Sequence, residues 1–86
     1  MIYPTLHLNG TSADSLFSEY LNALHKTQNA IKALSEVTVH GRDYYPQGIG
    51  AIHQAQNEHA ERVMKLTSIV NDLTEILLNI QEQTQN

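Results

Sequence analysis

Two stretches of the chain repeat apolar residues every three or four positions, and these repeats constrain the fold more than any other feature. This spacing is the period of an α-helix with one apolar face. It predicts a first helix over 12–37 and a longer second helix over 50–82, followed by a polar tail at 83–86. The apolar positions are Phe17, Tyr20, Leu21, Leu24, Ile31 and Leu34 in the first helix, and Ile52, Ala55, His59, Val63, Leu66, Ile69, Val70, Leu73, Ile76, Leu77 and Ile80 in the second.

The segment 38–49 between the repeats contains the residues that end helices. Gly41 and Gly48 favour turns, and the residue before Pro46 is biased away from helical geometry. We therefore expect an all-α fold in one domain, an antiparallel two-helix hairpin connected by this turn. Residues 1–10 are expected to form a short extended arm, and Thr11 or Ser12 to cap the first helix.

The two predicted helices differ in length. At about 1.5 Å per residue, the first measures roughly 39 Å and the second roughly 50 Å. A tight turn would leave the end of the second helix beyond the start of the first, and Ile76, Leu77 and Ile80 lie in that overhang. The N-terminal segment and a second copy of the chain are the candidates to cover them. We therefore expect a homodimeric four-helix bundle or a larger symmetric assembly.

Composition and charge narrow the choice of partners. The chain has 86 residues and a net charge of −4, so a general affinity for nucleic acid or anionic membrane is not expected. It has no cysteine, which excludes disulfides and thiolate chemistry. The first ten residues do not resemble a signal peptide, and no apolar run approaches the roughly 20 residues of a membrane span. We expect a cytoplasmic protein.

No set of residues with the spacing of an enzyme or metal site stands out. His53 and His59 are six positions apart and face different sides of a helix. Acidic pairs at 58–61 and 72–75 lie on the same predicted helix, roughly 21 Å apart, and cannot share one ion. They are interpreted as a solvated face. We expect no catalytic residues, no metal and no cofactor.

The turn carries the residues that suggest ligand binding. Arg42 has the geometry to bind phosphate, and tyrosine rings offer flat faces on which a nucleobase can stack. No Ser, Thr, Asp or Asn stands where it would cap the second helix, so its first amides are open to an anionic acceptor. The alternative is a purely structural turn. The candidate ligand-binding residues are His40, Arg42, Asp43, Tyr44, Tyr45, Gln47, Gly48 and Gly50.

Two segments resemble a known group of proteins. The stretches LHLNGTS (6–12) and GRDYYPQG (41–48) resemble motifs of a family of small phage and prophage proteins without a settled activity. The predicted architecture is also similar to that of phage anti-defence sponges, which are helical-hairpin oligomers that sequester cyclic oligonucleotide or cyclic ADP-ribose signals. This second resemblance concerns the architecture alone and assigns no residues.

Three hypotheses follow from the sequence. The first is a non-enzymatic phage-type protein, a homo-oligomer that captures a small anionic ligand, most simply a nucleotide immune signal, at the 40–50 turn. The second is a homodimeric adaptor or inhibitor that presents the same turn to a host or virion protein. The third is a structural oligomer whose turn binds nothing. A cluster of Tyr and Arg residues is compatible with all three.

Overall fold

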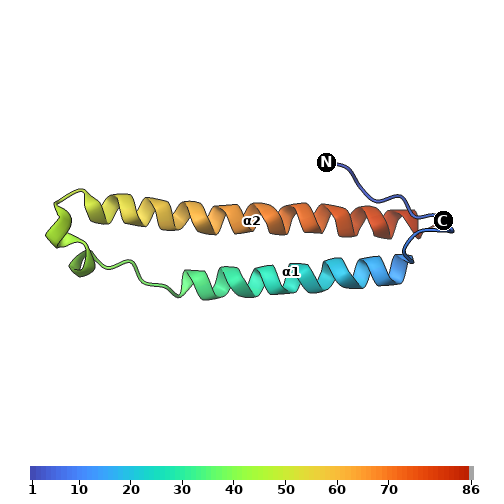
Figure 1. The fold of residues 1–86 in the computed structure, drawn as a ribbon, viewed down its shortest axis with the longest axis horizontal. Coiled ribbons are helices and arrows are strands. Elements are labelled where there is room, and N and C mark those ends of the chain that lie inside the picture. Colours follow the sequence, from blue (N-terminus) through green and yellow to red (C-terminus); the bar gives the residue numbers. More distant parts are fainter. Residues whose placement is uncertain (86) are drawn as a thin grey trace.

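The computed structural model describes residues 1–85 and is all-helical in that part of the chain. It contains α1 (Ala13–Ser35), two short 3₁₀ helices, η1 (Gly41–Asp43) and η2 (Tyr45–Gln47), and α2 (Ala51–Gln83). Helices α1 and α2 lie side by side as a hairpin, with the connection at one end (Figure 1). The predicted helical hairpin is confirmed. Both α-helices begin and end within two residues of the expected positions.

Helix α1 begins at a side-chain cap. The Oγ atom of Ser12 accepts a hydrogen bond from the backbone N–H of Ser15 at 3.2 Å, and Ser12 itself has extended backbone geometry. Asp14 in the first turn and Lys32 in the last turn complement the helix dipole. The helix ends at Ser35, two residues before the predicted end, where the β-branched run 37–39 begins. Of the two predicted capping residues, Ser12 therefore acts as the cap.

The predicted overhang at the end of α2 is wrong. Ala13 and Phe17 of α1 line the same cavity as Ile80 and Thr84, so the end of α2 lies beside the start of α1. The part of α2 without α1 beside it is its first turns, which face the connection (Figure 1). The reason is that residues 36–50 do not turn tightly. The first of these residues continue beside the first turns of α2, and η1 and η2 then turn the chain back at the tip, so that the connection takes up the difference in helix length (Figure 1).

The N-terminal arm lies against the last turns of α2. The side-chain amide of Gln83 donates a hydrogen bond to the carbonyl of Pro4 at 2.8 Å and accepts one from the N–H of Leu6 at 2.9 Å. The hydroxyl of Tyr3 donates to Glu75 at 3.0 Å. These bonds tie the first residues of the chain to its last helix.

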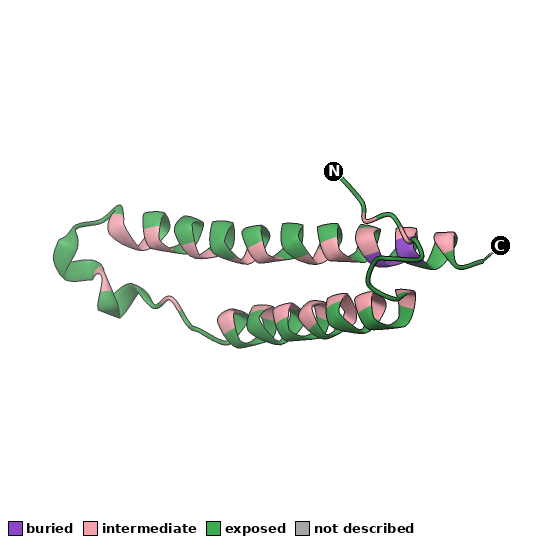
Figure 2. Cartoon of the chain, turned by 45° about the vertical axis from the view of Figure 1, so that its right-hand side comes forward, coloured by how far each residue is buried: buried purple, intermediate pink, exposed green. Residues whose placement is uncertain are grey.

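The core is small and lies at the arm end of the hairpin. Leu77 and Ile80 are 6% and 1% exposed and are the buried residues of the part described, 1–85. Figure 2 shows them at the end of α2, while the remaining inner faces of both helices are half-buried. The hairpin therefore has a hydrophobic core at one end and a half-covered apolar seam along the rest of its length.

Candidate functional site

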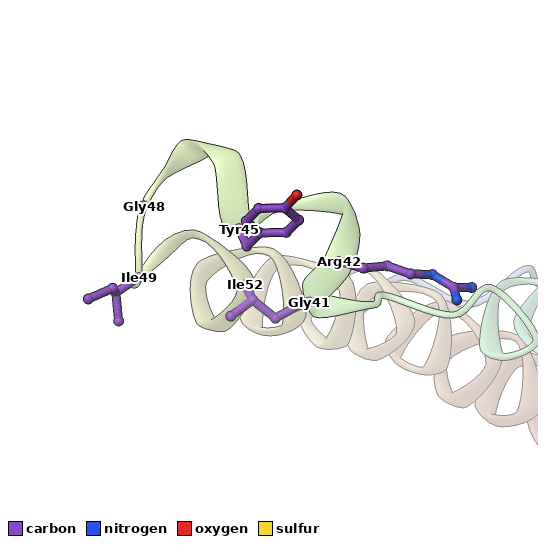
Figure 3. Close-up of a pocket in the computed structure, with 6 residues that line it drawn as sticks. All are labelled: Gly41, Arg42, Tyr45, Gly48, Ile49 and Ile52. Atoms are coloured by element: carbon purple, nitrogen blue, oxygen red, sulfur yellow. The ribbon is translucent and has the colours of Figure 1, made fainter.

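The connection and the start of α2 enclose an open cavity of about 470 Å³ at the tip of the hairpin. It is larger than the cavity of about 230 Å³ at the arm end, and it lies where the sequence predicts a site. Figure 3 shows the side chains around it. The cavity is lined by Gly41, Arg42, Tyr45, Gly48, Ile49 and Ile52.

Local backbone hydrogen bonds build the walls of this cavity. The N–H of Tyr44 donates to the carbonyl of Gly41 at 3.0 Å, which closes η1, and the N–H of Gln47 donates to Tyr44 at 2.9 Å, which closes η2. Pro46 stands in the first turn of η2, where its fixed φ suits a helix. Gly48 then has φ 114° and ψ 168°, a conformation that essentially only glycine adopts. These features set the path of the chain from η2 into α2.

The cavity surface is mainly apolar, with one cation at its edge. Tyr45 is 75% exposed, and its ring stands above the half-buried Ile52 (Figure 3). Ile49 is 95% exposed and points outward from the tip of the hairpin. The guanidinium of Arg42 extends away from the Tyr45 ring, back along the hairpin. The geometry thus offers a flat aromatic face with a long cationic side chain beside it.

The start of α2 adds unpaired backbone donors next to the cavity. Gly50 is the N-cap residue and no side chain caps the helix, as the sequence predicts. The N–H of Ala51 donates to the carbonyl of Gly48 at a long 3.4 Å. Within residues 1–85, the N–H groups of Ile52 and His53 have no backbone acceptor. Open amides at a helix N-terminus attract anionic oxygens.

The structure gathers only part of the predicted residue set. Arg42, Tyr45 and Gly48 line the cavity. Tyr44 is half-buried between η1 and η2, so its ring is not a free stacking face. The other predicted residues lie in the same segment outside the lining, and they are His40, Asp43, Gln47 and Gly50.

Three lining residues were not among the predicted ones: Gly41, Ile49 and Ile52. Ile52 was assigned to the helix seam, where its half-buried state also fits. The sequence could have indicated a surface role for Ile49, because a single large apolar residue between two glycines belongs to no apolar face of a helix or strand. Gly41 is expected to favour the turn after the first helix and to open the GRDYYPQG motif, and neither role predicts a place in the cavity wall.

Within residues 1–85, the histidines and carboxylates offer no metal-binding cluster. In the part of the chain that the structure describes, no three His, Asp or Glu side chains come together in a way that would hold a metal ion. No helix in the described residues combines the length and hydropathy needed to cross a bilayer.

The chain was also compared with known proteins. It matches no protein-family model, no curated protein and no solved structure. The resemblance to phage proteins is therefore a hypothesis that rests on the two motifs alone.

Proposed function

We propose that the protein is a non-enzymatic binding protein that captures a small anionic ligand of the nucleotide class at the tip of the hairpin. The observation that carries the proposal is the exposed Tyr45 ring beside the uncapped N-terminus of α2. A base would stack on Tyr45 above Ile52. Anionic oxygens would bind the open amides of α2, and Arg42, whose side chain is exposed, would swing to them.

The phage-like motifs suggest which nucleotides are relevant. In this proposal the protein acts in the cytoplasm of an infected or lysogenic host cell. Its ligand would then be a nucleotide immune signal, and its action would be to lower the free concentration of that signal. A sponge needs affinity and abundance but no catalytic residues, which agrees with a site built from one ring, backbone amides and one cation.

A thermal-shift screen tests the proposal. The protein is melted with mononucleotides, cyclic di- and trinucleotides and cyclic ADP-ribose isomers, each in excess. A ligand at 100 times its Kd adds about 2.7 kcal/mol of stability, which raises the Tm of a domain of this size by several degrees. Arg42→Ala is expected to weaken binding roughly tenfold or more. The matched control is Lys26→Ala, which removes an exposed cation from α1.

Two results would contradict the proposal. One is the absence of a shift with every nucleotide. The other is a shift of equal size in the wild type, Arg42→Ala and Tyr45→Ala, which would mean that the ligand binds elsewhere on the molecule.

A second candidate function, a protein-binding adaptor, is favoured by one observation. Ile49 lines the edge of the cavity, but its side chain is 95% exposed and points outward from the tip of the hairpin. Exposed Tyr, Ile and Arg side chains grouped at a tip resemble the centre of a protein interface. The two functions predict different results with nucleotides. The adaptor predicts no thermal shift with any nucleotide and a loss of partner capture in Tyr45→Ala, whereas the nucleotide-binding protein predicts a shift that Tyr45→Ala reduces.

A further inference from the structure

We infer that the apolar seam between α1 and α2 is covered by a second copy of this chain, so that two antiparallel hairpins form a four-helix bundle. This inference does not depend on the ligand proposed for the tip. It rests on the burial, the surface area and the charge distribution of the described residues.

The first observation is how little of the seam is buried. Apart from Leu77 and Ile80, the large apolar residues that α1 and α2 turn toward each other are only half-buried within residues 1–85. They extend over most of the length of the hairpin, and they include Phe17, Leu21, Leu24, Val63, Leu66 and Val70. Two helices alone shield one line of contact, whereas four helices enclose such faces on all sides.

The second observation is the surface area. The chain exposes 6500 Å², whereas a compact monomer of its 9.7 kDa mass exposes about 5,100 Å². The excess of about 1,400 Å² exceeds the roughly 800 Å² that each partner buries in a standard stable interface. The radius of gyration, 18.9 Å, is likewise well above the roughly 12 Å expected for a compact domain of this length. A partner is therefore needed to complete the burial.

The third observation identifies the partner. All five basic and all nine acidic residues are exposed, so the half-buried seam carries no Asp, Glu, Lys or Arg. A face without cations has no electrostatic attraction for the phosphates of nucleic acid or of an anionic membrane. The hairpin measures 61 Å along its longest axis, and a second hairpin matches that length and apolar character. A two-fold axis pairs such a face with itself.

Sedimentation equilibrium of the full chain tests this inference. We expect a mass of twice 9.7 kDa at micromolar concentrations, and a Tm that rises with protein concentration because association stabilises the folded state. Val70→Asp places a charge in the seam and should reduce the mass toward that of one chain. Asn71→Asp is the matched control, since it adds the same charge at the exposed neighbouring position and should leave the mass unchanged.

The wild-type measurement keeps the test decisive even if Val70→Asp does not fold. A wild-type mass of 9.7 kDa together with a Tm that does not depend on concentration would overturn the inference, and the seam would then need an occupant other than a second copy.

Discussion

The Oε1 atom of Gln83 accepts a hydrogen bond from the backbone N–H of Leu6 at 2.9 Å, although 77 positions separate the two residues. The Nε2 atom of the same amide donates to Pro4 at 2.8 Å and to Asn79 at 2.7 Å. The Gln83 side chain thus pairs with one backbone donor and one backbone acceptor of the arm, as a neighbouring β-strand would. The arm is held at the end of the hairpin where Leu77 and Ile80 are buried.

Replacing Gln83 should release the arm. Gln83→Ala removes both bonds to the arm, each worth roughly 0.5–1.5 kcal/mol, so the free energy of unfolding should fall by about 1–3 kcal/mol. Urea denaturation measures this loss, and limited proteolysis should show faster cleavage within residues 1–8. Gln56→Ala, at an exposed position of α2, is the control and should change neither. Equal effects of the two substitutions would show that Gln83 does not hold the arm.

The cap of α1 gives a second prediction. Ser12→Ala leaves the N–H of Ser15 without its side-chain acceptor and should lower the free energy of unfolding by about 1 kcal/mol. Ser18→Ala, at an exposed site inside the same helix, should be neutral or slightly stabilising because alanine is the better helix former. Thermal denaturation followed by circular dichroism compares the two variants, and Ser12→Ala should have the lower Tm. A lower Tm for Ser18→Ala would contradict the assigned cap.

Two glycines at the tip should respond in opposite directions to the same substitution. Gly48 has φ 114°, so Gly48→Ala should cost about 1–3 kcal/mol. Gly50 has helical geometry with φ −85°, and a Cβ atom added there meets nothing within 4 Å. Gly50→Ala should therefore stabilise the fold by about 0.4–1 kcal/mol. Comparing the two Tm values tests the path of the chain through the tip, and a destabilised Gly50→Ala would show that this path is wrong.

The contact between Tyr3 and Glu75 predicts a pH dependence. The hydrogen bond to Glu75 raises the pKa of Tyr3 above its ordinary value of 10.0, and partial desolvation and the charges of Glu75 and Glu82 raise it further. Because the pKa is higher in the folded chain, the contribution of this contact is complete below pH 10 and is lost as the pH rises through the raised pKa.

A spectroscopic titration of the tyrosines measures this effect. Tyr3→Phe should remove the transition of one tyrosine above pH 10, and Glu75→Gln should move that transition back toward 10.0. The arm should also become more sensitive to proteolysis at alkaline pH in the wild type. A titration curve that is unaffected by Glu75→Gln would show that the two side chains are not in contact.

The helices were predictable because their apolar residues recur with the helical period. Binary patterning of this kind depends only on local sequence, and it placed both α-helices within two residues of their ends. The register between the helices was not predictable in the same way. It depends on how much length the connection takes up, and nothing in the pattern indicates that residues 41–47 form two 3₁₀ helices.

The role of Gln83 and the exact lining of the cavity depend on tertiary contacts, which the sequence pattern indicates only weakly. Gln83 stands in a polar run that reads as a frayed tail, and its role becomes apparent only when Pro4 and Leu6 lie beside it. At the tip, the Tyr and Arg residues indicated the segment that lines the cavity of about 470 Å³. Which of them line the cavity depends on the 3₁₀ helices, which expose Tyr45 and leave Tyr44 half-buried.

Amide NMR titration of the ¹⁵N-labelled protein is the decisive test of the proposed ligand site. Mononucleotides, cyclic dinucleotides and cyclic ADP-ribose are added in turn while the glycine and isoleucine signals are followed. We expect at least one of these nucleotides to shift the signals of Gly48, Ile49 and Ile52 while that of Gly10, near the arm, stays in place. If none of them moves the signals of the tip, or if Gly10 moves as much as Gly48, the tip of the hairpin is not a nucleotide site.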